Sequence, residues 1–116
     1  MSERRKMGRV FARCSVVLKV LEGKCAGAAI GTPCYGHTTD FSMYGARLVM
    51  GTEYQVNSQV ELILVLTNPA ATFRHVGVIR WCRRSTADQK FFVGVEFTAS
   101  SPKTTQAWAK FVSSRF

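Results

Sequence analysis

The sequence contains none of the short motifs that mark the common enzyme classes. It has no Gly-x-Ser-x-Gly nucleophile turn, no Gly-x-x-x-x-Gly-Lys phosphate loop and no His-Glu-x-x-His zinc motif. Only seven residues are acidic, and they are scattered without an obvious pair for general acid–base chemistry. A nucleophile built from Cys34 and His37 would lack a third, orienting group. We therefore expect a binding protein with no catalytic residue and no enzymatic activity.

Metal ligands are also few, since the chain has only two histidines and no Cys-x-x-Cys pair. The cysteines are Cys14, Cys25, Cys34 and Cys82. Cys34 and His37 have a metal-like spacing, but a tetrahedral zinc site needs about four ligands and Cys25 is the only other candidate nearby. We expect no metal and no cofactor, and we interpret the cysteines as reduced, small apolar residues.

Long apolar segments are absent as well. No run approaches the roughly 18 apolar residues of a membrane-spanning helix. The basic start is not followed by the apolar stretch of a signal peptide. We expect a cytoplasmic protein without membrane insertion, in which residues 1–116 form one domain, because single domains cluster at roughly 100–150 residues.

Positive charge is what the sequence has in excess. It carries 16 Lys and Arg residues, a formal net charge of +9 and a pI near 10.0. Such a field attracts anions such as nucleic acid, acidic lipid, a nucleotide or an acidic protein, although a solvated surface explains charge alone equally well. Basic residues cluster near the start, at Arg4, Arg5, Lys6, Arg9 and Arg13.

Strand patterns dominate the rest of the chain. Short β-branched and apolar stretches alternate with polar turns, which is typical of an antiparallel barrel or sandwich. The predicted strands are 15–21, 47–50, 59–66, 76–82 and 91–97. The glycine-rich region 23–36 is predicted to be a long loop, with at most a weak strand near its end.

The two ends of the chain have different characters. The sequence after Ser101 predicts a C-terminal helix over 101–114, with Ser101 as the N-cap and Pro102 in the first turn. Trp108, Phe111 and Val112 share one helix face, which we expect to pack on the barrel as a lid. Residues 1–10 are too polar to bury and are predicted to form a mobile arm.

Two short motifs suggest an anion site. Arg4, Arg5 and Arg9 form Arg-Arg-x-x-x-Arg, and the planar guanidinium group matches phosphate oxygens two at a time and stacks on bases. The second motif is Asp40-Phe-Ser-Met-Tyr-Gly45, in which Asp40 and Ser42 would share one face of a strand. A carboxylate there accepts from N–H edges such as those of guanine, and a hydroxyl donates to a phosphate oxygen. Either motif alone has an ordinary structural interpretation.

Together, in this order and spacing, the motifs resemble the PilZ family of bacterial cyclic di-GMP receptors. The family signature is Arg-x-x-x-Arg followed some 30 residues later by Asp/Asn-x-Ser-x-x-Gly. Gly77-Val-Ile-Arg-Trp81 and Phe92-Val-Gly-Val-Glu-Phe97 also look like late strands of the family. The resemblance implies a six-stranded antiparallel β-barrel with a C-terminal α-helix, and it departs in region 23–36, to which we assign no role.

The resemblance also implies a ligand and residue roles. Cyclic di-GMP would be bound by Arg4, Arg5, Arg9, Asp40, Ser42 and Gly45. The arginines would contact phosphates and stack on guanines, Asp40 and Ser42 would read a guanine and support the phosphate, and Gly45 would permit the turn. An arginine before the Arg-x-x-x-Arg unit is compatible with an intercalated pair of ligand molecules. Ligand binding would order the arm and signal through an unidentified effector protein.

Two alternatives stay open. One keeps the fold and drops the ligand, as in family members that act only as protein–protein adaptors. The other is a small nucleic-acid-binding barrel that uses Arg83, Arg84 and the aromatic residues Tyr44, Phe73 and Trp81, although we do not expect nucleic acid as the partner. Trp81 itself fits either the core or the rim of a ligand site.

Overall fold

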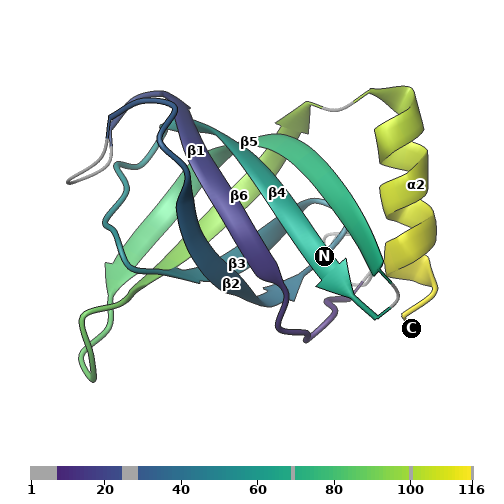
Figure 1. Cartoon of the computed structure of the whole chain (residues 1–116), viewed down its shortest axis with the longest axis horizontal. Coiled ribbons are helices and arrows are strands. Elements are labelled where there is room, and N and C mark those ends of the chain that lie inside the picture. The colour runs from purple at the N-terminus through teal and green to yellow at the C-terminus, as the bar shows by residue number, and fades with distance from the viewer. Residues whose placement is uncertain (1–7, 25–28, 69, 100, 116) are drawn as a thin grey trace.

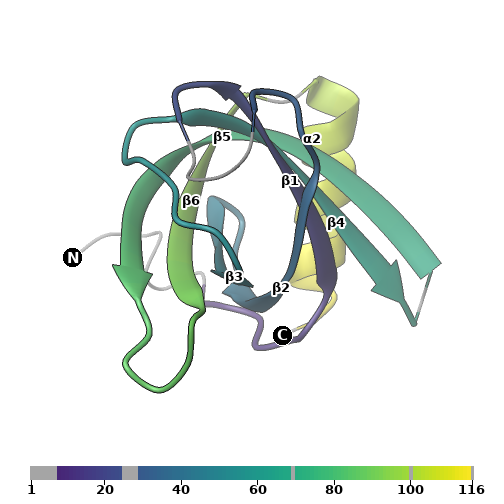
Figure 2. The same ribbon diagram turned by 60° about the vertical axis from the view of Figure 1, so that its left-hand side comes forward.

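The computed structural model describes residues 8–24, 29–68, 70–99 and 101–115. Six antiparallel strands close into a barrel in the order β1-β2-β3-β6-β5-β4 (Figures 1 and 2). The strands are β1 (Ser15–Glu22), β2 (Cys34–Phe41), β3 (Gly45–Met50), β4 (Gln59–Thr67), β5 (Ala70–Arg84) and β6 (Phe91–Ala99). The architecture predicted from the sequence is confirmed.

The barrel interior is filled by alternate residues of each strand. In β4 every second side chain is buried, because successive side chains of a strand point to opposite faces. The inward-facing residues of β1, β3, β5 and β6 join those of β4 in one contiguous apolar core. Its fully buried members include Val16, Leu18, Leu48, Met50, Val60, Leu62, Leu64, Ile79 and Val93.

The largest differences from the predicted strands are at the starts of β2 and β5. β2 begins at Cys34, near the end of region 23–36, where at most a weak strand was predicted, and it continues to Phe41. β5 begins at Ala70 rather than at Val76. Neither segment shows a clear apolar alternation. Thr38 and His75 occupy buried positions in these strands, and their polarity hid the strand period.

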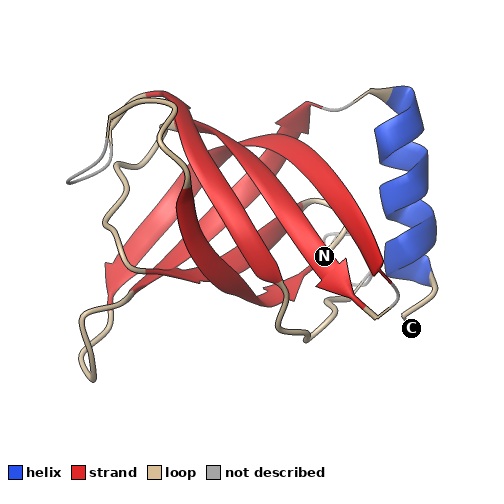
Figure 3. Ribbon diagram, in the orientation of Figure 1, coloured by secondary structure: helices blue, strands red, loops and turns tan. Residues whose placement is uncertain are grey.

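Helix α2 (Pro102–Ser113) lies across one end of the barrel, as Figure 3 shows. Ser101 is the N-cap, and its hydroxyl accepts a hydrogen bond from the Thr104 N–H. Trp108 and Val112 are buried and Phe111 is half-buried, so the predicted lid face is confirmed.

An aromatic cluster joins this helix to the barrel. Trp108 contacts Phe41, Phe73 and Phe97 at ring-centroid distances of 5.3, 5.0 and 5.9 Å. His75 stacks on Phe97 with centroids 3.9 Å apart and meets the edge of Trp108 at 4.7 Å. The cluster places α2 next to the end of β2, where the second sequence motif lies.

Candidate functional site

The structure brings four of the six predicted site residues together. Arg4 and Arg5 lie outside the described residues. Arg9 directly precedes Val10, which forms an isolated antiparallel bridge with Phe41. Asp40 lies near the end of β2, while Ser42 and Gly45 flank the turn that leads into β3.

The turn between β2 and β3 is held by its own hydrogen bonds. The Ser42 N–H donates to the Gly45 carbonyl at 2.8 Å, and the Tyr44 N–H donates to Ser42 Oγ at 3.2 Å. Trp108 Nε1 donates to the Ser42 carbonyl at 3.1 Å, which ties the turn to α2. Ser42 therefore occupies a turn rather than a strand, and a Cβ at Gly45 would overlap the carbonyl oxygen of Val95 in β6.

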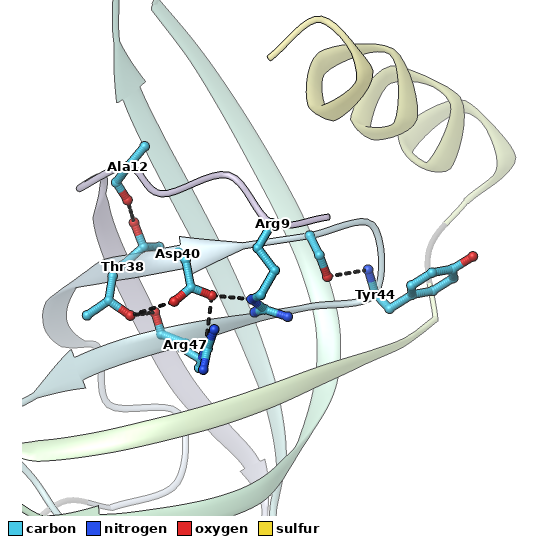
Figure 4. A network of polar contacts seen from close by, with 8 residues as sticks. Arg9, Ala12, Thr38, Asp40, Tyr44 and Arg47 are labelled. Atoms are coloured by element: carbon cyan, nitrogen blue, oxygen red, sulfur yellow. Dashed lines mark hydrogen bonds and ion pairs between the residues drawn. The ribbon is translucent and has the colours of Figure 1, made fainter. Parts of the chain in front are cut away.

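Asp40 is the centre of a cluster of charged side chains (Figure 4). Arg9 Nε and Arg47 Nε both donate to Asp40 Oδ1, the second at 2.9 Å. Thr39 Oγ1 donates to Asp40 Oδ2 at 3.1 Å. Asp40 is only 4% exposed, so its carboxylate lies behind the two arginines. We call Arg9, Asp40 and Arg47 the arginine–aspartate cluster.

The charge state of Asp40 follows from these contacts. Burial raises the pKa of its carboxyl, but the hydrogen bonds and charges of Arg47 and Arg9 outweigh that effect, and the pKa lies below its usual value. Asp40 is therefore ionised at neutral pH and fixes both guanidinium groups. Each guanidinium contacts Asp40 through Nε and carries four further N–H donors at its Nη atoms.

An open groove of about 620 Å³ begins at this cluster and crosses the outer face of β3, β6 and β5. We call it the first groove. Its described lining is Arg9, Ser42, Tyr44, Gly45, Ala46, Arg47, Arg80, Trp81, Gly94, Val95 and Glu96. Three guanidinium groups meet there with the carboxylates of Asp40 and Glu96, which leaves the groove positive.

Trp81 forms a wall of the first groove, so it lies at the rim of the candidate ligand site and not in the barrel core. Arg47 pairs with Gly94 across β3 and β6, and Gly94 pairs with Trp81 across β6 and β5. The indole ring lies directly over Gly94, where a Cβ would overlap it. A half-buried aromatic face thus lies in the same cross-strand row as a guanidinium group. A planar, negatively charged ligand fits this pairing.

We expect Gly94→Ala to displace the Trp81 ring, because the added Cβ would overlap the indole. Overpacking of this kind lowers the free energy of unfolding by about 1–3 kcal/mol. Urea unfolding followed by tryptophan emission measures the change. Gly51→Ala is the matched control, since nothing lies within 4 Å of a Cβ there. Equal stabilities of the two variants would contradict the packing of Trp81 on Gly94.

Arg47 lies outside all the sequence motifs, while Arg80 and Gly94 belong to the two late-strand segments and were given no role in the site. Arg47 follows the second motif by two residues, and strand alternation from Gly45 places both on the outer face of β3. Arg80 is paired with Glu96 at 2.6 Å, at a register shift between Ile79 and Trp81. That shift was not visible in the sequence, so the outward direction of Trp81 was not predictable.

Comparison with known proteins settles the family. The PilZ domain model matches residues 3–113. This chain belongs to the PilZ family. The solved structure of the Bacillus subtilis inhibitor of motility, MotI/DgrA, superposes on this PilZ domain with a TM-score of 0.72 and 16% identity. The match covers 92% of this chain and 48% of that one, so this PilZ domain spans about half of that protein's length. No curated protein sequence matches it.

Three further features of this PilZ domain concern metal ligands, cysteines and membrane-spanning helices. Within the described residues, no three His, Cys, Asp or Glu side chains gather in a way that would hold a metal ion. Cys14, Cys34 and Cys82 are free thiols, and Cys25 lies outside the described residues. In the described part of the chain, no helix has both the length and the apolar character of a membrane span.

Proposed function

We propose that this chain is a cyclic di-GMP receptor that binds the nucleotide in the first groove. The observation that carries the proposal is the arginine–aspartate cluster beside the half-buried Trp81 ring. Cyclic di-GMP is a dianion with two purine faces, so it requires cations for its phosphates and flat surfaces for its bases. Membership of the PilZ family, which includes cyclic di-GMP receptors, supports the same ligand.

The cluster assigns separate tasks to its members. Arg9 and Arg47 present Nη donors to phosphate oxygens, while Asp40 keeps both groups oriented from its buried position. Arg4 and Arg5 add the further cations that the signature provides. Ser42 and Gly45 line the groove at the turn, where the ligand would meet them. Trp81 offers an aromatic surface to a guanine, which would share the ring with the Arg83 guanidinium 5.2 Å from its centroid.

Binding then acts as a switch in this proposal. The arginines of the N-terminal arm close over the nucleotide, and the arm with its ligand forms a new surface for a protein partner. That partner produces the cellular response, and motility or biofilm formation is the response to measure. We do not propose enzymatic activity.

The nucleic-acid alternative receives less support from the geometry. Of its three aromatic residues, Phe73 packs against Trp108 and Phe111 beneath the helix, where no base reaches it. Arg83 and Arg84 end β5, and their guanidinium groups stand over the rings of Trp81 and Phe91 at 5.2 and 5.9 Å. Neither arginine is among the described residues that line the first groove.

Titration calorimetry with cyclic di-GMP tests the proposal. We expect roughly micromolar binding by the wild type, and a loss of about 1.5–3 kcal/mol in Arg5→Ala and in Arg9→Ala, the range for a hydrogen bond to a charged group. That loss is about a 10- to 150-fold weaker affinity. The fitted stoichiometry distinguishes one ligand from an intercalated pair.

Arg74→Ala is the control for charge, because Arg74 pairs with Glu61 and does not line the first groove. It should bind like the wild type. Undiminished binding by Arg5→Ala and Arg9→Ala would overturn the assigned roles. Absence of any heat with the wild type would leave the ligand-independent adaptor as the better interpretation.

A further inference from the structure

A second groove of about 470 Å³ lies on the other side of Arg9. It runs between segment 9–15, the end of β4 and the last turn of α2. Val10, Phe41 and Leu66 form an apolar floor, and Phe111 adds a half-buried ring. Of the described residues that line the second groove, none is acidic, whereas its basic members are Arg9, Arg13 and Arg115.

One edge of segment 10–14 is already paired. The Val10 and Phe41 backbones exchange hydrogen bonds of 2.7 and 3.0 Å. The Thr38 N–H donates to the Cys14 carbonyl at 2.9 Å, and the Cys14 N–H donates to Thr38 Oγ1 at 2.9 Å. The Thr38 hydroxyl also donates to the Ala12 carbonyl at 2.6 Å. This edge is therefore occupied by β2, as Figure 4 shows for Ala12 and Thr38.

The opposite edge is open. In the described part of the chain, the backbone N–H and C=O groups of Phe11 and Arg13 have no hydrogen-bond partner. The pairing of β1 with β4 ends at Ser15 and Val65, so β4 does not cover the edge. Val10, Ala12 and Cys14 are the residues whose backbone groups bond to β2. Because successive residues of a paired segment alternate in direction, the backbone groups of the intervening Phe11 and Arg13 are directed away from β2. The Phe11 side chain is 78% exposed beside them.

We propose that the second groove is the docking site for an extended, acidic peptide segment of a protein partner. The segment adds as a strand to the open edge at Phe11 and Arg13, a mode in which main-chain hydrogen bonds give affinity and alternate side chains give specificity. Its apolar side chains enter the floor, and its carboxylates meet Arg13 and Arg115. This inference deepens the proposed function, because it names the chemistry of the partner that the proposed switch requires.

Charge and backbone hydrogen bonding favour an acidic peptide over a second copy of the chain or an anionic lipid. A second copy of the chain carries the same net charge of +9, whereas an acidic segment is complementary to the groove. An anionic lipid would match the arginines and the apolar floor but would leave the open backbone donors and acceptors unused. Arg9 lines both grooves, which gives the nucleotide a direct route to the partner surface.

The test uses the full chain, labelled with ¹⁵N, and the synthetic peptide acetyl-Glu-Phe-Asp-Leu-Glu-amide. We expect the peptide to shift the amide signals of Phe11, Arg13 and Asn68 and to leave that of Gly94 unchanged. The double variant Arg13→Gln/Arg115→Gln should bind the peptide about tenfold more weakly or worse. The control Arg74→Gln/Arg84→Gln, which removes the same charge outside both grooves, should bind within about twofold of the wild type.

N-methylation of the peptide distinguishes strand addition from side-chain contact alone. Because only alternate N–H groups of an added strand face the edge, methylating one alternate set should abolish binding and methylating the other should be tolerated. Tolerance of both sets, or shifts outside the second groove, would overturn the proposal.

The same samples are titrated with cyclic di-GMP. Peptide binding without nucleotide binding refutes the proposed receptor function alone, and the reverse refutes the docking site alone.

Discussion

Trp108→Ala is expected to lower the free energy of unfolding by about 3–5 kcal/mol, the range for truncating a buried aromatic residue. Trp108 is 2% exposed and contacts Phe41, Phe73 and Phe97. The substitution opens a cavity between α2 and the barrel, and most of the helix's buried face is lost with it. The Ser42 carbonyl also loses its donor from the indole N–H.

Chemical denaturation followed by far-ultraviolet circular dichroism measures this loss of stability. Phe92→Ala is the control, because Phe92 is a half-exposed aromatic residue on the outer face of β6 and should cost at most about 1 kcal/mol. A Trp108→Ala variant as stable as Phe92→Ala would show that α2 does not anchor the turn at Ser42. In that case the helix would not belong to the framework of the proposed site.

Acidification from pH 6.5 to pH 4 is expected to destabilise the fold by roughly 3 kcal/mol through His75 alone. His75 is 3% exposed, and neither ring nitrogen has a hydrogen-bond partner in the described part of the chain. Burial therefore lowers the pKa of its imidazole to about 4. Between the ordinary pKa of 6.5 and that value, the unfolded chain binds a proton that the folded chain does not. Stability is thus complete above pH 6.5 and falls as the pH decreases.

Urea unfolding at a series of pH values measures this dependence in wild type and in His75→Phe. The phenyl ring keeps the stacking on Phe97 without a titrating group, so most of the slope between pH 6.5 and pH 4 should disappear. His75→Leu serves as a second variant if the larger ring does not fit. Protonation of Asp40 destabilises the fold only below the ordinary carboxyl pKa of 3.8, so its effect is separate from that of His75. A slope unchanged in both variants would contradict this account.

A smaller acid slope should persist in those variants because of His37. Burial and the charges of Arg13 and Lys90 lower the pKa of this imidazole. His37 is partly exposed on β2, so solvent screens these charges. Its contribution therefore has the same sign as that of His75 but a smaller size.

The barrel was predictable where apolar alternation or turn chemistry is explicit. β1, β4 and β6 follow the predicted ranges closely, and Ser101 with Pro102 located the start of α2. β2 was hidden because strand pairing, rather than apolar period, holds its polar residues. Thr38 is buried there because its hydroxyl hydrogen-bonds to the backbone of segment 10–14, a contact between distant parts of the sequence.

The candidate site was predictable only as a pair of motifs. The sequence placed Arg9 and Asp40 in one site, and the structure joins them in an ion pair. It did not show that Asp40 is buried behind Arg9 and Arg47, because that depends on the register shift between Thr38 and Asp40. The position of Trp81 likewise depends on a register shift in β5 and on the missing side chain of Gly94.

The most direct test of the central claim is to map cyclic di-GMP onto the ¹⁵N-labelled full chain by amide and indole chemical shifts. Binding in the first groove predicts large shifts at Gly45, Arg47 and Gly94 and at the indole N–H of Trp81. The outer face of β1, at Val17 and Lys19, should show none. An unchanged spectrum at millimolar nucleotide, or shifts confined to residues outside the first groove, would contradict the proposed receptor function.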